Sequence, residues 1–201
     1  MRVIGLCGGS GSGKGAVCAL LLELGIPSVD TDAVYHELVG GPSECLTELV
    51  GAFGAEIIEN GALCRRALAD IVFTGEGKEE RLALLNGITH KHILARTRRM
   101  LGEFAGRGSR AAVVDAPLLF ESGFDAECDL TVAVVADREL RIARIMSRDN
   151  ITRREAERRI DSQVSDAVLS GKVDRVIIND GDLESLRVSV ESLVKSVLGD
   201  I

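Results

Sequence analysis

The 201-residue sequence predicts an α/β fold, in which a five-stranded parallel sheet is flanked by helices and interrupted by one helical insertion. Three observations support this fold. Short apolar runs, typical of buried parallel strands, alternate along the chain with longer amphipathic stretches. A glycine-rich segment, residues 7–15, stands between the first apolar run and the first helical stretch. The chain is 46% hydrophobic and 27% charged, which is typical of a globular protein large enough to bury a core.

The glycine-rich segment reads Cys-Gly-Gly-Ser-Gly-Ser-Gly-Lys-Gly and follows an apolar run at residues 3–6. Gly8 and Gly13 occupy the glycine positions of the phosphate-binding motif G-x-x-x-x-G-K, and Lys14 completes it. In such a P-loop, successive backbone N–H groups point at one anion, at the positive end of the following helix. A flexible turn is the alternative, but it rarely separates a buried strand from a helix. The residues expected to bind nucleotide phosphates are Gly8, Gly9, Ser10, Gly11, Ser12, Gly13, Lys14, Gly15 and Ala16.

The first helix is expected to end near Leu24, because Gly25 suits a C-cap position and Pro27 blocks continuation. Residues 28–30 form a short second strand, and Asp30-Thr31-Asp32 opens a helix that runs to residue 39. The carboxyl ends of adjacent parallel strands line one crevice, where ligands bind. The two carboxylates therefore either cap the helix or act on a ligand there, by contacting Mg²⁺ or by deprotonating an acceptor hydroxyl.

The next part of the chain predicts helices and no strand of the main sheet. Residues 43–53 and 65–73 have helical periodicity, and residues 78–104 form one long amphipathic helix. We therefore expect an inserted helical lobe over residues about 54 to 108. His90 and His92 lie two positions apart on the long helix, so they point to different faces and are expected to be solvated rather than to share a metal.

Three further strands complete the sheet. Residues 110–115 form an apolar strand that ends in Asp115, which is the pattern of a Walker B strand whose carboxylate holds the Mg²⁺ shell. A carboxylate at a strand end can also merely cap the next turn. Residues 130–135 are a continuous apolar run, and residues 173–179 form the last strand, followed by a helix from Leu183.

Arginines are concentrated between the last two strands, where eight arginines stand among four acids over residues 138–159. Arg138, Arg141, Arg144 and Arg148 follow at intervals of three, three and four, so they form one stripe on a helix. Thr152 to Glu155 is a capping-box signature that begins another helix. Because guanidinium groups match phosphate oxygens bidentately, we interpret this region as a cationic lid over a polyphosphate, with the lid at about 148 to 166, rather than as a solvated face.

Composition limits the partners and the compartment. The net charge of −7 argues against a nucleic-acid-binding surface, and no stretch reaches the ~18 apolar residues of a membrane span. The five cysteines form no C-x-x-C pair and no metal-ligand spacing, which favours free thiols in a reducing cytosol. We therefore expect a cytoplasmic protein with no nucleic acid and no membrane among its partners.

A series of short segments, spread over nearly the whole chain, carries a family resemblance. In chain order they are Ile4-Gly5-Leu6, Gly8 to Lys14, Gly25-Ile26, Asp30-Thr31-Asp32, Leu85 to His90, Asp115 to Glu121, Arg144 to Asp149, Arg159-Ile160 with Gln163, and Ile178 to Gly181. Together they resemble the dephospho-CoA kinases, which phosphorylate the ribose 3′-hydroxyl of dephospho-coenzyme A in the last step of coenzyme A synthesis. The Asp-Thr-Asp and the Pro-Leu-Leu-Phe-Glu segments are more specific than the P-loop.

The resemblance implies a P-loop kinase fold with an inserted substrate lobe and an Arg-rich lid. It implies that Asp32 is the general base that accepts the 3′-hydroxyl proton, and that Lys14 and the loop amides hold the ATP phosphates. Arg144 and Arg148 would contact phosphates during transfer, and Asn179 would lie near adenine. The inserted lobe would hold dephospho-CoA.

The expected cofactor and assembly follow from the same reading. We expect Mg²⁺ to be bound with ATP beside Asp115 and Asp32, through water, because Mg²⁺ readily keeps several waters in its octahedral shell. The expected substrates are ATP and dephospho-CoA, and the expected state is a monomer or a weak homo-oligomer.

Three positions depart from the family pattern. Gly15-Ala16 replaces the usual Ser-Thr pair, so the hydroxyl that ligates Mg²⁺ directly is missing; Lys91 replaces a proline, and Cys64 replaces an aspartate. Two other functions therefore stay open. One is another small-metabolite or nucleoside-monophosphate kinase on the same scaffold. The other is a nucleotide-binding module with weak or no catalysis, for which Gly15 is the only support.

Overall fold

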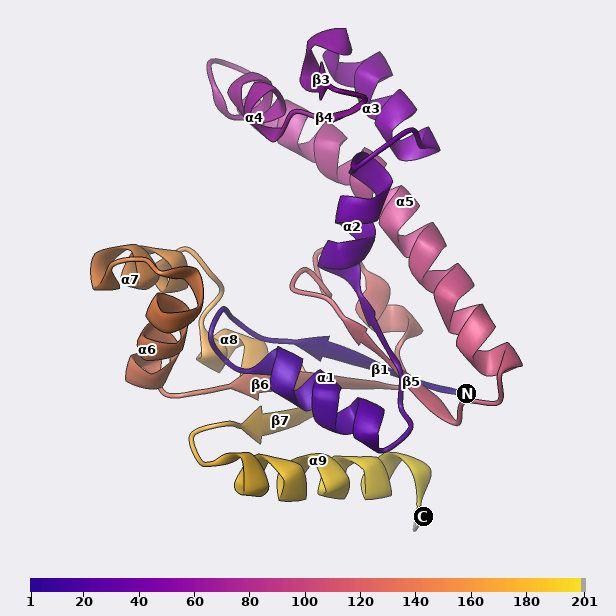
Figure 1. Ribbon diagram of the computed structural model, residues 1–201, viewed down its shortest axis with the longest axis vertical. Coiled ribbons are helices and arrows are strands. Elements are labelled where there is room, and N and C mark those ends of the chain that lie inside the picture. Colours follow the sequence, from indigo (N-terminus) through magenta and orange to yellow (C-terminus); the bar gives the residue numbers. More distant parts are fainter. Residues whose placement is uncertain (200–201) are drawn as a thin grey trace. The chain divides into compact units, whose positions relative to one another are not determined.

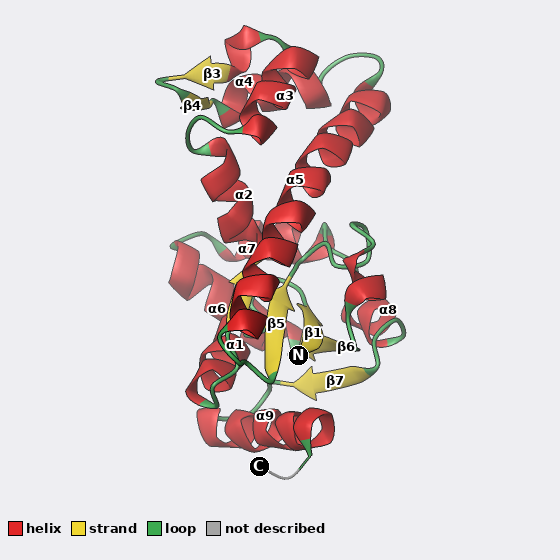
Figure 2. Ribbon diagram, turned by 90° about the vertical axis from the view of Figure 1, so that its right-hand side faces the viewer, coloured by secondary structure: helices red, strands yellow, loops and turns green. Residues whose placement is uncertain are grey.

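The computed structural model describes residues 1–199 and divides the chain into two compact units. The first comprises Met1–Val29 together with the chain from Leu101 onward, and the second comprises Asp30–Met100. Figure 1 labels their helices and strands, and Figure 2 shows the same elements coloured by type. We describe each unit by itself.

The first unit is built on a five-stranded sheet with the order β2-β5-β1-β6-β7. Its strands are β1 (Arg2–Cys7), β2 (Ser28–Asp30), β5 (Ala111–Asp115), β6 (Leu130–Val135) and β7 (Arg175–Ile178). The central strand β1 pairs in parallel with β5 on one side and with β6 on the other. The predicted five-stranded parallel sheet is confirmed, with β1 at its centre because its residues are apolar on both faces.

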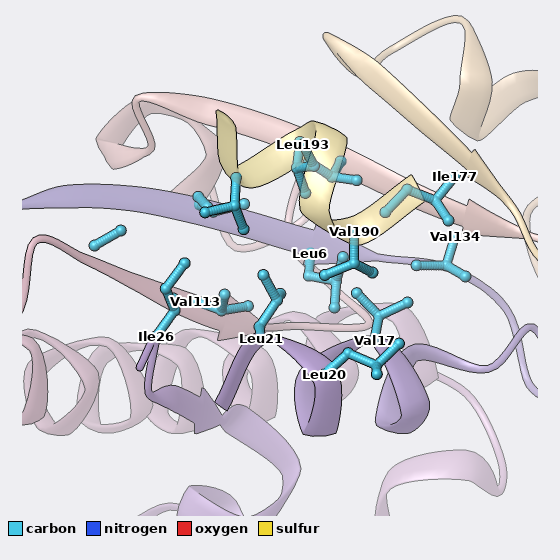
Figure 3. Close-up of a cluster of buried hydrophobic side chains, with 14 of the residues drawn as sticks. Leu6, Val17, Leu20, Leu21, Ile26, Val113, Val134, Ile177, Val190 and Leu193 are labelled. Carbon is cyan, nitrogen blue, oxygen red and sulfur yellow. The ribbon is translucent and has the colours of Figure 1, made fainter. Parts of the chain in front are cut away.

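One face of the sheet is covered by α1 (Lys14–Glu23) and α9 (Leu183–Leu198), which pack against each other. Alternate strand residues such as Leu6 and Val134 point toward these helices, and Leu21 of α1 and Val190 of α9 fill the space between them (Figure 3). Each such side chain, when fully buried, stabilises the fold by roughly 1.5–3 kcal/mol. The helices therefore fix the direction in which the loop between β1 and α1 leaves the sheet.

The opposite face of β1 is covered by the segment that follows β5, which includes η2 (Phe124–Glu127). A Cβ at Gly5 would lie 2.8 Å from Cys128 Sγ and 2.9 Å from Leu119 Cδ2, so only glycine allows this close approach. None of the five cysteines, all of which lie within the described residues, forms a disulfide. Burial raises the pKa of Cys7 to about 11 and that of Cys128 to about 12, so both thiols stay protonated at neutral pH.

Three helices connect β6 to β7: α6 (Arg138–Asp149), α7 (Arg153–Asp161) and α8 (Asp166–Ser170). Helices α6 and α7 pack side by side through an apolar contact that includes Ile145 and Ile160. The capping box predicted from Thr152 and Glu155 is present at the start of α7. The five-residue helix α8 begins where the predicted lid of about 148 to 166 ends. The sequence indicates no separate helix there, because a single turn leaves no periodic pattern.

The second unit contains α2 (Thr31–Val39), α3 (Glu44–Phe53), η1 (Ala55–Ile57), the hairpin of β3 (Ile58–Glu59) and β4 (Ala62–Leu63), α4 (Arg65–Phe73) and most of α5 (Lys78–Gly106). Its core joins α2, α3, α4 and α5 through residues such as Val39, Leu49, Val72 and Ile88. The unit therefore begins at Asp30, earlier than the lobe expected at about 54 to 108, because α2 and α3 share this core.

A tight turn and a buried histidine are two local features of this unit. The Asn60-Gly61 turn has positive φ at both residues, 52° and 80°, as a tight hairpin turn requires. His92, expected to be solvated, is instead largely buried, and its Nε2 lies 2.7 Å from Glu48 Oε2. Lys91 Nζ also donates to Glu48, at 2.6 Å, so α5 is tied to α3 by charged groups that the helical pattern alone could not pair.

Within residues 1–199, no helix is both long and apolar enough to cross a membrane.

Candidate functional site

The loop between β1 and α1 has the backbone geometry that its glycines predict. Gly8, Gly11 and Gly13 have φ values of 148°, 77° and 100°, which side chains other than glycine rarely adopt. A Cβ at Gly8 would overlap the Val134 carbonyl oxygen, and one at Gly13 would overlap the side-chain amide of Asn179. The loop therefore lies directly against the ends of β6 and β7, and its glycines are required by these close contacts.

Lys14 begins α1 and reaches back across the loop. Its Nζ donates to the Gly8 carbonyl at 3.0 Å and lies 3.9 Å from Asp115 Oδ1. The side chains of Lys14 and Asp115 are 16% and 17% exposed, so the charge is partly screened from water yet accessible. An anion beside the loop would meet this ammonium group and the positive end of α1 together.

Asp115 reaches the same place from the neighbouring strand. It is paired in register with Leu6 of β1, so the carboxyl ends of β1 and β5 lie side by side and the loop starts next to this carboxylate. The Cys18 thiol, one turn along α1 from Lys14, donates to Asp115 Oδ2 at 3.9 Å. This is the arrangement of a P-loop lysine beside a strand-end acid that the sequence predicted from residues 110–115.

Gly15 stands in the first turn of α1, where a Cβ would have no atom within 4 Å other than its own surroundings in the helix. Packing therefore does not require glycine at this position. No cluster of three or more His, Cys, Asp or Glu residues that could hold a metal ion occurs in the described chain. A carboxylate such as Asp115 fits a hydrated Mg²⁺ ion whose other ligands are water and phosphate oxygens, because Mg²⁺ is usually bound in this way.

The arginine stripe on α6 divides into residues with different partners. Arg144 donates to two backbone carbonyls, from Nη1 to Gly11 at 3.3 Å and from Nη2 to Asn179 at 3.0 Å. Arg148 forms a bidentate ion pair with the adjacent Asp149, at 2.7 and 2.9 Å. The structure therefore brings Arg144 onto the loop itself, whereas Arg148 is paired on the outer part of α6.

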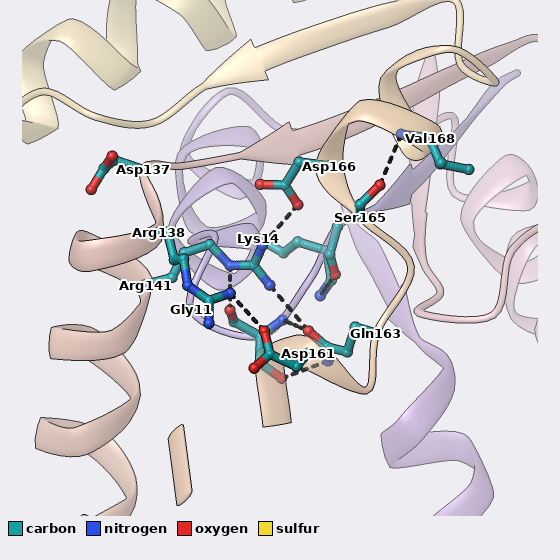
Figure 4. Close-up of polar contacts among 12 residues, drawn as sticks. Gly11, Lys14, Asp137, Arg138, Arg141, Asp161, Gln163, Ser165, Asp166 and Val168 are labelled. Atoms are coloured by element: carbon teal, nitrogen blue, oxygen red, sulfur yellow. Dashed lines mark hydrogen bonds and ion pairs between the residues drawn. The ribbon is translucent and has the colours of Figure 1, made fainter. Parts of the chain in front are cut away.

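The first two arginines of the stripe, Arg138 and Arg141, also have partners. Arg138 pairs with Asp161 of α7 at 2.8 Å, and both side chains are at least half exposed. Arg141, one turn further, is instead 4% exposed and lies against the tip of the loop (Figure 4). Periodicity placed these residues on one helix face correctly, but it could not distinguish buried from exposed members of the stripe.

Asn179 follows the end of β7 and is 6% exposed. Its Nδ2 donates to the Ser12 carbonyl at 2.8 Å, so this side chain supports the second half of the loop. Gly11, Ser12, Arg144 and Asn179 thus form one connected group of hydrogen bonds around the loop.

The two carboxylates of Asp30-Thr31-Asp32 have different surroundings within the second unit. Asp30 is the N-cap of α2, because its Oδ1 accepts from the backbone N–H groups of Asp32 at 2.9 Å and Ala33 at 3.0 Å. Asp32 is exposed and lies in the first turn of α2. The capping role therefore belongs to Asp30, and the Asp32 carboxylate is left available for chemistry.

Sequence reasoning did not assign a site role to Gln163, between α7 and α8, or to Asp166, at the start of α8. Gln163 exchanges two hydrogen bonds with Ser10 of the loop, and Asp166 pairs with Arg141. Gln163 appeared only as part of a family motif, and no local pattern connects it with a loop 153 positions away.

Comparisons with known proteins agree with this geometry. A family model described as dephospho-CoA kinase matches residues 2–185. A dephospho-CoA kinase of Corynebacterium glutamicum is 40% identical over 202 residues and covers 100% of both chains. One from Moorella thermoacetica is 39% identical over 194 residues, which is 96% of this chain and 90% of the relative.

Solved structures show the same fold. The crystal structure of TT1252 from Thermus thermophilus superposes with a TM-score of 0.79, at 32% identity over 98% of each chain. Dephospho-CoA kinase from Campylobacter jejuni gives a TM-score of 0.70, at 23% identity over 100% of each chain. Shikimate kinase from Acinetobacter baumannii, at 13% identity and a TM-score of 0.54 over 98% of this chain and 93% of its own, shares the fold.

Proposed function

The chain belongs to the dephospho-CoA kinase family, and we propose how its residues divide the reaction of that family among themselves. The reaction is the ATP-dependent phosphorylation of dephospho-CoA in coenzyme A biosynthesis, so the enzyme is a kinase with two small-molecule substrates. In phosphoryl transfer a protein contributes mainly by positioning the reactants and by stabilising charge. The proposals below assign those two tasks.

The ATP phosphates are held by the loop of residues 8–16 and by Lys14. The main support for this assignment is the geometry of the loop. Its glycines are closely packed, and it lies at the positive end of α1, beside the partly shielded ammonium group of Lys14. Asn179 and Arg144 would keep the loop in this shape through the carbonyls of Ser12 and Gly11. Asn179 would also lie near the adenine.

Asp32 is the general base. Its carboxylate accepts the proton of the ribose 3′-hydroxyl while that oxygen forms a bond to the γ-phosphorus of ATP and the bond to the bridging oxygen of ADP breaks. This role is supported by the capping of α2, because Asp30 is the N-cap and the exposed Asp32 is not needed for that purpose. A carboxylate two residues after a strand end is suitably placed in sequence for this role in an open parallel sheet.

Mg²⁺ would be held by Asp115, with Asp32 contributing through water. When bound, this ion would neutralise charge on the phosphate oxygens. The oxygen donors suit it, and Gly15 supplies none, so one coordination position would be taken by a water.

Arg144 and Arg148 would contact phosphate oxygens during transfer. Arg144 already lies on the loop, whereas Arg148, whose side chain is 60% exposed, would have to exchange the partly buried carboxylate of Asp149 for a phosphate. Asp149 would keep its ion pair with Arg159, so the exchange would not leave this carboxylate without a cationic partner. The segment of about 148 to 166 would then act as a lid.

The helical lobe of about 54 to 108 would bind dephospho-CoA. We further propose a cytoplasmic enzyme that is a monomer or a weak homo-oligomer, which is the setting expected for a kinase of a soluble metabolite.

The direct test is ADP release from Mg-ATP, measured by a coupled assay with dephospho-CoA and with a panel of other acceptors that includes nucleoside monophosphates. We expect turnover only with dephospho-CoA. Faster turnover with another acceptor would identify a different small-metabolite kinase. Binding of ATP and dephospho-CoA without turnover would instead indicate a nucleotide-binding module that has lost catalysis.

A further inference from the structure

Ser10 stands at the tip of the loop, and all three of its polar groups are bound by side chains from the α6–α8 region. Its N–H donates to Gln163 Oε1 at 2.9 Å, and its hydroxyl accepts from Gln163 Nε2 at 2.9 Å. Its carbonyl accepts from Arg141 Nε, also at 2.9 Å. The tip is therefore attached to two elements that lie more than 100 positions away in the sequence.

The two side chains that hold Ser10 are also joined to each other. Arg141 Nη2 donates to Gln163 Oε1 at 3.1 Å, and Arg141 Nη1 forms an ion pair with Asp166 Oδ1 at 2.8 Å. The Arg141 side chain is only 5% exposed. A guanidinium group so deeply buried must have partners for its charge and its N–H groups, and the loop supplies one of them. We call Ser10, Arg141, Gln163 and Asp166 the loop latch.

The neighbouring glycines are shaped around this latch. A Cβ at Gly9 would overlap the Arg141 guanidinium group and would lie 2.9 Å from Gln163 Oε1. A Cβ at Gly11 would lie 2.7 Å from the Arg141 carbonyl oxygen. Gly9 therefore packs against the side chain of Arg141 and Gly11 against its backbone. The conformation of this half of the loop depends on the positions of Arg141 and Gln163.

The Ser10 N–H is already used by Gln163 Oε1 and the Ser12 N–H by the Gly9 carbonyl, so the amides available to a phosphate are those of Gly11, Gly13 and the first residues of α1. These amides bind an anion well only when they are aimed in advance, since ordering a flexible glycine loop costs conformational entropy at the moment of binding. A latch that fixes the loop tip removes part of that cost.

We propose that Arg141 and Gln163 are positioning residues for ATP, which act through Ser10 to hold the P-loop in its phosphate-binding conformation. This inference rests on the proposed role of the loop in binding ATP phosphates. This task differs from the phosphate contacts proposed for Arg144 and Arg148, because neither Arg141 nor Gln163 needs to touch the nucleotide.

The experiment measures the Kd for ATP by titration calorimetry in Ser10→Ala, Gln163→Ala and the double variant. Loss of one hydrogen bond corresponds to about a fivefold change in an equilibrium constant, so Gln163→Ala should weaken ATP binding by about tenfold or more. The double variant should bind within about twofold of Gln163→Ala, because both single changes break the same contact. The KM for dephospho-CoA should stay within about twofold of the parent value.

The matched control is Ser165→Ala, two residues from Gln163. It removes the N-cap of α8, where Ser165 Oγ accepts from Val168 N, without touching the loop. Thermal unfolding is measured for every variant. If Ser165→Ala weakens ATP binding as much as Gln163→Ala at an equal loss of thermal stability, the latch is merely structural and the proposal is wrong. Additive effects of Ser10→Ala and Gln163→Ala would overturn it equally.

Arg141→Lys provides a second variant if removal of the amide prevents folding. Lysine keeps a positive charge for Asp166 but cannot bond to Ser10 and Gln163 at once, so ATP binding should again weaken by about fivefold. An unchanged Kd would contradict the proposal. Because binding is measured without turnover, the result is independent of the acceptor: a parent enzyme that binds ATP but does not phosphorylate dephospho-CoA would contradict the proposed function and leave the test of the latch intact.

Discussion

Asp30 and Asp32 are two carboxylates two positions apart, and only the first has a structural partner that explains it. Asp32→Asn keeps the size and polarity of the side chain but removes its ability to accept a proton. We therefore expect kcat to fall by about 10²- to 10⁴-fold, while the Kd for ATP barely changes. Steady-state ADP release and calorimetric ATP binding measure the two quantities.

Asp30→Asn is the matched control for this prediction. Asparagine is as good an N-cap as aspartate, so α2 should keep its start and turnover should be nearly normal. Nearly normal turnover in Asp32→Asn as well would show that neither carboxylate is the base.

Gly15 leaves the P-loop without its usual hydroxyl, and the surrounding space is open. Gly15→Ser should therefore fit without strain and should also favour α1, because glycine destabilises a helix by roughly 0.5–1 kcal/mol relative to alanine. We expect the serine variant to need less Mg²⁺ for half-maximal activity at saturating ATP. A Mg²⁺ titration of dephospho-CoA-dependent ADP release gives this value for both proteins.

Gly15→Ala separates the two effects of that substitution. Alanine improves the helix but offers no oxygen, so its Mg²⁺ curve should match that of the parent. Equal shifts for alanine and serine would mean that helix stability, not a metal ligand, is responsible. Activity in Gly15→Ser alone would favour a parent chain without catalysis.

At the start of α4, Cys64 stands where the family pattern has an aspartate, and this difference has a physical consequence. Cys64 is the N-cap, with φ −79° and ψ 95°, but its side chain makes no capping hydrogen bond, and the first turn of α4 has no acid. Aspartate at this position would accept from a free backbone N–H and would face the positive end of the helix. Cys64→Asp should therefore raise the stability of the second unit by about 0.5–1 kcal/mol.

Urea unfolding followed by tyrosine fluorescence measures this gain. The chain has one tyrosine and no tryptophan, and Tyr35 packs against the core of the second unit, so its emission reports on that unit. Cys64→Ala is the control, because it removes the thiol without adding an acceptor. A midpoint in Cys64→Asp no higher than in Cys64→Ala would contradict the capping argument.

Secondary structure was predictable wherever a local pattern determines it. The apolar run of β6 was expected at residues 130–135 and is found there, and the capping box of α7 involves the residues that indicated it. The P-loop was predicted from the spacing of Gly8, Gly13 and Lys14 together with the strand before them and the helix after them, and its glycines have the positive φ values of such a loop. Helix α8 and the burial of His92 were not predictable in this way, because a short helix has no periodicity and the partner of His92, Glu48, lies 44 positions away.

The division of the chain into two units could not be predicted from local patterns either. The apolar faces of α2 and α3 indicate helices, but nothing local shows that they pack with α4 and α5 rather than on the sheet. The arginine stripe is comparable. Spacing defines one helix face, but it does not show that Arg141 and Arg144 also donate to loop carbonyls more than 130 positions away. Long-range pairing, which decides these features, leaves no signature in a single sequence.

Hydrogen bonds and ion pairs to carboxylates make the stability of the protein depend on pH. Several carboxylates accept hydrogen bonds from arginine, lysine, histidine or threonine side chains or from backbone N–H groups, and these bonds lower their pKa values. They are Glu48, Asp129, Glu139, Asp149, Glu155, Asp174 and Asp182. For Asp149, the hydrogen bond from Arg148 is the largest cause, and the pKa falls from 3.8 to about 2.

Because these pKa values are lower in the folded than in the unfolded chain, the unfolded chain takes up more protons as the pH falls. The stabilisation is complete above about pH 4–5, near the unfolded pKa values, and is lost progressively toward pH 2. We expect the free energy of unfolding, measured by urea titration with circular dichroism, to be nearly constant from pH 7 to 5 and to fall steadily below pH 4.

Asp174→Asn is the most informative variant, since Asp174 accepts from both the N–H and the hydroxyl of Thr131, at 2.8 and 2.7 Å. An asparagine cannot be protonated in this range, so the variant should be less stable at pH 7 and should lose less stability between pH 5 and 3. A parent protein equally stable at pH 5 and pH 3 would show that these carboxylates do not couple folding to protonation.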